Sequence, residues 1–153
     1  MTSTMKKTFT ARASVIIDAP AQKVWEALTR PEIIKKYFFG TDTVTDWKVG
    51  GPIQFSGEFN GKSYKDRGTV LEVDPGTLVR YQYWSSLSGL PDVPENYLTI
   101  SYFLTELDSK TRLDISQENV KNELVRDHSE ENWRKVLSNL KRMIENNAKV
   151  LAF

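Results

Sequence analysis

The hydrophobic positions of this chain follow two periods, one typical of strands and one typical of helices. From Phe9 to Ile17 apolar residues occupy alternate positions, which predicts a half-buried strand. The alternation returns after Gly40, between turn residues such as Asn60-Gly61. It predicts six further strands, at about 43–47, 53–59, 64–73, 79–83, 98–104 and 113–119. Because most of the links are short, we expect a largely antiparallel sheet.

Helical spacing of apolar residues occurs in three segments. Two short helices are expected after the first strand, one following Pro20 and one starting at Pro31. A long amphipathic helix is expected from Ser129 to about Asn147, with apolar residues at Trp133, Val136, Leu137, Leu140, Met143 and Ile144. Asp127, with Glu130 three residues later, is expected to cap its start.

These elements predict an α+β fold, in which a curved antiparallel sheet of about six to seven strands wraps around a long C-terminal helix. The chain has 153 residues, of which 39% are hydrophobic, and this fits a single domain over 1–153. Residues 1–7 lack an apolar pattern, and we expect them to be flexible.

Charge and composition exclude several classes of function. The 21 basic and 20 acidic residues give a net charge of +1 without a basic cluster, so nucleic acid is not an expected partner. The chain has no cysteine, which excludes disulfides, a thiolate nucleophile and a cysteine-ligated metal, and fits a reducing cytoplasm. No apolar run approaches the roughly 20 residues that span a bilayer. We therefore expect a cytoplasmic protein that does not insert into membranes.

The sequence contains no recognisable catalytic or cofactor motif. Its single histidine, His128, directly precedes the expected long helix and should be solvated, so a histidine-dependent nucleophile is not expected. No carboxylate spacing matches a calcium loop, and Gly50-Gly51 is not followed by a lysine and a helix as in a phosphate-binding loop. We therefore expect no metal and no cofactor.

Aromatic residues recur on the expected inner faces, and they are the candidate binding residues. The ligand-binding set predicted from the pattern is Phe38, Phe55, Phe59, Tyr64, Tyr81, Tyr83, Tyr102, Gln117, Trp133 and Leu137. An alternative is that the tyrosines only reach the rim with their hydroxyls outward. Gln117 and Asn119 would be the polar end of a cavity, or would lie past the buried part of their strand. Asp66 and Arg67, like Glu58 and Glu72, could either face inward as a pair or form a solvated face.

One connection, Ser85 to Asn96, is about 12 residues long and has the composition of turns. Connections of this length in compact domains are often functional or mobile. The segment is either a surface loop or a flap over the mouth of a pocket, and the sequence leaves both open.

Several segments, in this order and spacing, resemble the SRPBCC superfamily, which is related to START domains and the birch-pollen allergen. They most resemble its branch named after the activator of the 90-kDa heat-shock protein ATPase. The matching segments are 17–29 (IDAPAQKVWEALT), Pro31-Glu32, 47–52 (WKVGGP), 68–75 (GTVLEVDP) with Val79 and Tyr81 after it, and 133–140 (WRKVLSNL). The resemblance extends over 9–147, and it implies the helix-grip fold.

The resemblance also implies a hydrophobic cavity between the sheet and the last helix, which in this superfamily binds lipids, polyketides or flavonoid-like aromatics. We therefore expect a non-enzymatic protein that binds a small hydrophobic, aromatic or lipid-like molecule. The alternatives are a cyclase- or aromatase-like enzyme that uses the same cavity, and a chaperone-associated or regulatory protein-interaction module. The co-chaperone that names the branch has an additional N-terminal domain, for which 153 residues leave no room.

Overall fold

A computed structural model describes residues 7–151 and confirms the α+β helix-grip fold. Its single antiparallel sheet has the strand order β1-β7-β6-β5-β4-β3-β2. The strands are β1 (Phe9–Ile17), β2 (Asp42–Thr45), β3 (Pro52–Phe59), β4 (Lys62–Asp74), β5 (Leu78–Trp84), β6 (Leu98–Leu107) and β7 (Lys110–Val120). The helices are α1 (Ala21–Thr29), α2 (Pro31–Tyr37), the 3-10 turn η1 (Pro94–Asn96) and α3 (Glu123–Leu151). The expected flexibility of 1–7 falls almost wholly outside the described residues.

The sheet is a meander from β2 to β7, and only the pairing of β1 with β7 joins distant parts of the chain. Short turns make this order possible. At the β3–β4 turn, Asn60 and Gly61 both have positive φ, 51° and 79°, as a two-residue hairpin turn requires. The sequence-based prediction of this turn is confirmed.

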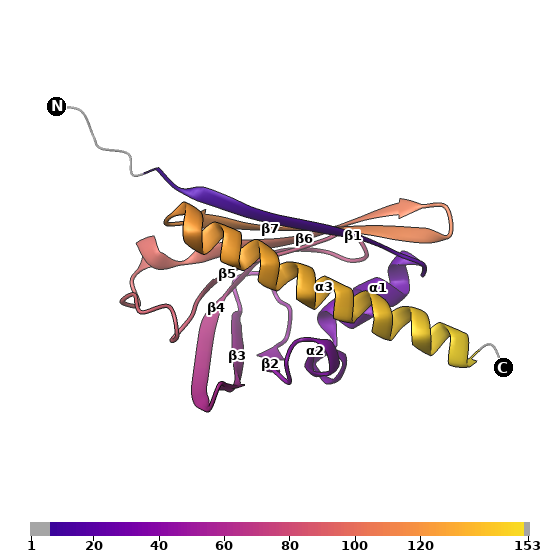
Figure 1. The fold of residues 1–153 in the computed structure, drawn as a ribbon, viewed down its shortest axis with the longest axis horizontal. Helices are drawn as coiled ribbons and strands as arrows, with labels where there is room; N and C mark the ends of the chain where they lie inside the picture. The colour runs from indigo at the N-terminus through magenta and orange to yellow at the C-terminus, as the bar shows by residue number, and fades with distance from the viewer. Residues whose placement is uncertain (1–6, 152–153) are drawn as a thin grey trace.

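α3 runs along the β1 side of the sheet, while β3 and β4 extend away from it (Figure 1). β1 is an edge strand, and side chains of α3 bond to its outward backbone groups. The Arg12 N–H donates to Glu130 Oε2 over 2.9 Å, and Lys141 Nζ donates to the Ile16 carbonyl over 2.7 Å. A third bond, from the Asp18 N–H to Glu145 Oε2, is 2.8 Å long. Backbone groups of an exposed edge would otherwise be free to pair with another chain.

α3 begins six residues before its expected start, and Asp127 is not its cap. Asn122 caps the helix instead, because its Oδ1 accepts the Val125 N–H over 2.9 Å. The first turns were missed because their apolar residues do not face the core: Leu124 is 81% exposed. The other expected capping residue, Glu130, lies inside the helix and bonds to β1.

The core forms where α3 and the two short helices cover the inner face of the sheet. Its aliphatic part gathers Leu140 and Val136 of α3 with Ile17 and Leu113 of the sheet, all of them fully or almost fully buried. α1 and α2 follow one another directly, with Pro31 at the first turn of α2, where its missing N–H costs nothing. Trp47 joins this corner to the sheet by donating its indole N–H to the Thr29 carbonyl over 2.7 Å.

Two glycines on the inner face allow close approaches that a larger residue would block. A Cβ at Gly68 would lie 1.7 Å from the Gln82 carbonyl oxygen, so β4 and β5 can approach here only because the residue has no side chain. A Cβ at Gly57 would lie 2.9 Å from the hydroxyl of Tyr64, whose ring crosses the strand at that point.

Candidate functional site

A continuous cluster of aromatic rings joins α2, the sheet and α3. The Trp133 ring of α3 lies edge-on to Phe38, with centroids 5.7 Å apart, and to Tyr102 at 6.1 Å. Tyr102 contacts Tyr81 at 5.7 Å, and Tyr81 in turn contacts Phe55 at 5.6 Å. Tyr83 closes the far end, 6.3 Å from Phe55 and 6.2 Å from Tyr81. Edge-on and tilted pairs of this kind stabilise by about 0.5–1.5 kcal/mol beyond the area they bury.

The polar atoms of the most deeply buried rings, Trp133, Tyr81 and Tyr102, all have hydrogen-bond partners. The Trp133 indole N–H donates to Gln117 Oε1 over 2.7 Å, and the Gln117 amide donates to Ser129 Oγ over 3.3 Å. The hydroxyls of Tyr81 and Tyr102 share a hydrogen bond of 2.8 Å. A buried polar group without a partner is costly, so these bonds allow polar rings in an otherwise dry interior.

The buried tyrosines are held neutral. Burial raises the pKa of Tyr102 to about 12, although the hydrogen bond with Tyr81 partly opposes the shift. Burial also raises the pKa of Tyr81 and of Tyr83, and the negative charge of Asp66 adds to the shift at Tyr83. The phenols can therefore act as hydrogen-bonding groups at neutral pH but not as bases.

A more polar region adjoins the rings on β2, β3 and β4. The Tyr64 and Thr41 hydroxyls lie 2.6 Å apart and share a hydrogen bond across Gly57. Thr43 faces the same interior, and its hydroxyl is buried without a hydrogen-bond partner among the described residues. Asp66 also lies on this face, directly opposite Phe55 in the strand register. Burial raises its pKa above the ordinary value of 3.8, although hydrogen bonds from Ser85 and Ser86 partly offset the rise.

The structure brings most of the predicted binding residues together. Seven of them belong to the ring cluster or bond directly to it: Phe38, Phe55, Tyr81, Tyr83, Tyr102, Gln117 and Trp133. Leu137 is buried in the same core one helical turn after Trp133, and Tyr64 stands at the polar end. Phe59 lies apart, 50% exposed at the end of β3.

The sequence left open which side of the sheet Asp66 faces. In the strand register Asp66 lies opposite Phe55 on the inner face, whereas Arg67 points to the outer side and pairs with Asp92. Thr43 was not among the predicted residues. The only feature that identifies it is the strand register, in which Thr43 pairs with Phe55 and therefore faces the interior.

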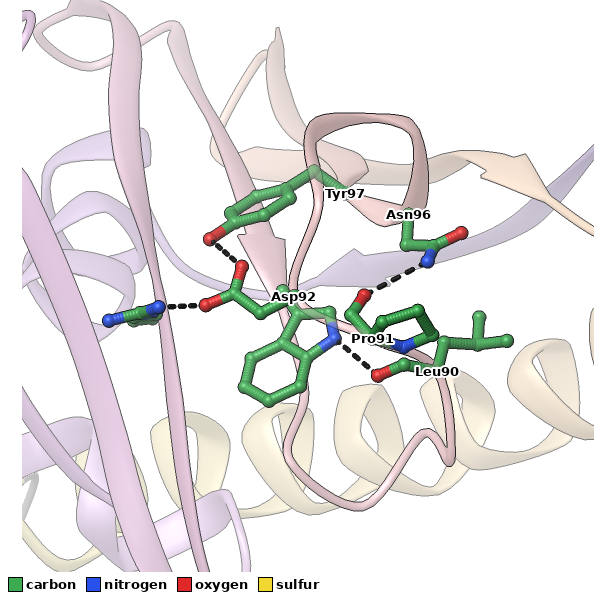
Figure 2. Close-up of polar contacts among 7 residues, drawn as sticks. Leu90, Pro91, Asp92, Asn96 and Tyr97 are labelled. Atoms are coloured by element: carbon green, nitrogen blue, oxygen red, sulfur yellow. Dashed lines mark hydrogen bonds and ion pairs between the residues drawn. The ribbon is translucent and has the colours of Figure 1, made fainter.

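The long connection between β5 and β6 is held to the sheet by many polar contacts (Figure 2). Asp92 pairs with Arg67 of β4 and accepts the Tyr97 hydroxyl over 2.7 Å. The Trp84 indole N–H donates to the Leu90 carbonyl over 3.0 Å. The Asn119 amide donates to the carbonyls of Glu95 and Tyr97, both over 2.9 Å. The segment is thus an ordered loop at the end of the sheet where Tyr83 and Asp66 lie.

Two surface hollows lie away from the ring cluster. One is on the outer face of the sheet, between Arg12, Arg80 and Arg112, and the other lies beside α1 and the β4–β5 turn. Buried rings of the cluster, Trp133, Tyr81 and Tyr102 among them, belong to the core between α3 and the sheet. Within 7–151, no group of three or more histidine, cysteine or acidic side chains is arranged to hold a metal. No helix in this described range has the length and apolar character to cross a membrane.

Comparison with known proteins identifies the family of this chain. The sequence model of the family described as Activator of Hsp90 ATPase homolog 1-like protein matches residues 18–145. The solution structure of ChR145 from Cytophaga hutchinsonii is 42% identical and has a TM-score of 0.80, over 92% of this chain and 97% of that one. No curated protein matches the chain.

Two more distant structures share the fold. The Aha1 dimer from Colwellia psychrerythraea is 23% identical, with a TM-score of 0.72 over 90% of this chain and 96% of that one. CalU16 from Micromonospora echinospora is 20% identical, with a TM-score of 0.67 over 90% of this chain and 83% of that one. At these identities the likeness concerns the fold alone.

Proposed function

Because the chain belongs to the family of Activator of Hsp90 ATPase homolog 1-like proteins, we propose that it binds a small hydrophobic molecule between the sheet and α3. The fold family commonly binds hydrophobic ligands. The observation that carries the proposal for this chain is the ring cluster centred on Trp133. Flat rings offer faces and edges on which an aromatic or lipid-like molecule can stack.

The partly buried rings of the cluster are where we place the entry of the ligand. Phe38, Phe55 and Tyr83 are only partly buried, in contrast to Trp133, Tyr81 and Tyr102. Turning one of these three side chains outward makes room beside the buried rings without breaking the Gln117–Trp133 or Tyr81–Tyr102 bonds. Binding therefore shifts the signals of the three partly buried rings most strongly.

The experiment measures binding of naphthalene and of lauric acid by chemical-shift perturbation, in the native protein and two variants. Trp133→Ala removes ring contacts, so we expect naphthalene to bind about tenfold more weakly, together with a loss of stability of about 3–5 kcal/mol. The control Ile144→Ala, at the far end of the core, should lose about 2–5 kcal/mol of stability and keep the native Kd.

Trp133→Phe provides the same test if the alanine variant does not fold. Equal effects of the Trp133 and Ile144 substitutions on binding would move the site away from the ring cluster. If neither naphthalene nor lauric acid binds the native protein, the proposed function is refuted.

One observation favours an enzyme as the second candidate. A cyclase- or aromatase-like reaction needs a group in the pocket that moves protons, and Asp66 is an inward-facing carboxylate whose pKa is raised by burial. The Asp66 carboxylate, beside Tyr83, would be the proton acceptor. Turnover of a polyketide substrate that is abolished in Asp66→Asn would establish the enzyme.

A chaperone-associated or regulatory protein-interaction role has weaker support. It calls for a continuous apolar surface. The exposed apolar residues Ile16 and Phe103 lie on the outer face, but Arg112 and Asp114 are their direct neighbours in the register. The cytoplasmic location expected from the composition stays a prediction.

A further inference from the structure

Within the part of the chain that the structure describes, the Thr43 hydroxyl is a buried polar atom without a hydrogen-bond partner. Thr43 is only 6% exposed, and among the described residues its Oγ1 accepts and donates no hydrogen bond. The nearby Thr41, 3% exposed and two residues earlier, bonds to Tyr64 over 2.6 Å. A buried hydroxyl without a partner destabilises the folded protein, so a methyl group in its place would be better tolerated.

The strand register places this hydroxyl inside the candidate site. Thr43 lies opposite Phe55 across β2 and β3, and Phe55 lies opposite Asp66 across β3 and β4. The three side chains therefore form one row on the inner face, because directly paired residues of antiparallel strands project to the same side. With about 5 Å between neighbouring strands, the two ends of the row are about 10 Å apart.

The row has the composition of a recognition site for a substituted aromatic molecule. Its middle is the Phe55 ring, which contacts Tyr81 and Tyr83. One end is the Thr43 hydroxyl, which can donate or accept a hydrogen bond. The other end is the Asp66 carboxylate, which already accepts the Ser86 N–H at Oδ1 over 3.1 Å and bonds to the side chains of Ser85 and Ser86. A carboxylate has two oxygens and about four lone-pair sites, so it can accept a further donor.

We propose that Thr43 and Asp66 determine specificity, by binding the polar substituents at the two ends of a planar hydroxylated or amino-substituted aromatic ligand stacked on Phe55. The inference rests on the proposed function and adds the chemical class of the ligand. The substituent at Asp66 is a hydrogen-bond donor, which excludes methoxy and halogen groups there. Simple hydrocarbons and fatty acids bind without using either residue.

The experiment compares 2,6-dihydroxynaphthalene with naphthalene as probes, by measuring both Kd values in the native protein and in three variants. We expect Thr43→Val to weaken binding of the dihydroxy probe by about 3- to 10-fold, the usual size of one hydrogen bond, and to leave naphthalene unchanged. Asp66→Asn should also weaken only the dihydroxy probe. The matched control Thr111→Val lies outside the candidate site and removes a buried hydroxyl that the Ala19 carbonyl satisfies over 2.8 Å, so it should keep the native ratio of the two Kd values.

The melting temperature gives a second measurement. Thr43→Val should raise it and Thr111→Val should lower it, because only the second substitution breaks a hydrogen bond. If the native ratio of Kd values survives in Thr43→Val, or if that variant melts at a lower temperature, the inference is overturned while the proposed function stands. If neither probe binds the native protein, the proposed function fails as well.

Discussion

The two halves of the sheet have different inner faces. Under α3, strands β1, β7 and β6 present mainly aliphatic side chains that are fully buried, such as Ile17, Leu113 and Ile100. On β5, β4 and β3 the inner face carries rings that are in part exposed, two glycines, and a carboxylate. We infer that the first half supplies the stability of the domain, and the second half, packed less completely, supplies its chemistry.

The difference has a physical origin in how α3 lies. The helix follows β1 and bonds to its outer edge, so its apolar stripe covers the nearest strands. Only its N-terminal part, through Trp133, reaches the aromatic rings. Rings from α2 and the sheet lie in the remaining space, and three of them, Phe38, Phe55 and Tyr83, stay partly exposed.

The strongest test of this division is a pair of truncations, one in each half. Leu140→Ala should lower the free energy of unfolding by about 2–5 kcal/mol, since the side chain is fully buried and its removal leaves a cavity. Phe55→Ala should cost less, because the ring is only partly buried. Urea denaturation of both variants measures the difference. A larger loss for Phe55→Ala would mean that the aromatic half carries the stability.

A smaller effect is expected at the loop that borders the aromatic half. Asp92→Asn removes the charge that pairs with Arg67 of β4 and weakens the hydrogen bond that Asp92 accepts from the Tyr97 hydroxyl. Because the ion pair is at the surface, we expect the global free energy of unfolding to fall by no more than about 1 kcal/mol. Amide hydrogen exchange in 85–96 should accelerate, while exchange in β1 and β7 should not change. Faster exchange throughout the sheet would mean that the loop is part of the main core.

The smallest expected effect concerns pH. Burial raises the pKa of Asp66 above its ordinary value of 3.8, so the folded protein binds this proton more tightly than the unfolded chain does. Stability contributed by the protonated form is present at low pH and is lost as pH rises from about 3.8 through the raised pKa. Asp66→Asn has no titrating group at this position. As pH rises from about 3.8 through the raised pKa, the free energy of unfolding of the native protein should therefore fall relative to that of the variant. A difference that does not vary with pH would mean that Asp66 is solvated.

The sequence predicted the sheet well because its local signals agree with the tertiary structure. Alternation over Phe9–Ile17 matches the observed bounds of β1, and the Asn60-Gly61 turn fixes the register of its hairpin. The start of α3 was missed because Asn122 caps two turns that carry no buried stripe.

The site was only partly predictable, for a similar reason. Rings on long strands, such as Tyr81 and Tyr102, show their facing through alternation. β2 has only four residues and β4 a bulge between Val70 and Glu72, so the facing of Thr43 and Asp66 depends on pairing with β3. Whether a buried hydroxyl finds a partner is a property of the packed interior, which no local pattern encodes.

The bonds between β1 and α3 also have a consequence for how the chain is made. β1 leaves the ribosome before the other strands of this sheet, yet its sheet partner is β7, and its outer edge bonds to Glu130, Lys141 and Glu145 of α3. These contacts span 118 to 127 residues of sequence. During synthesis, the meander from β2 to β7 can assemble as it emerges, whereas β1 can complete its contacts only after α3 has been made. Final closure of the sheet is therefore a late step, because both β7 and α3 have to be made before β1 is paired on one edge and covered on the other.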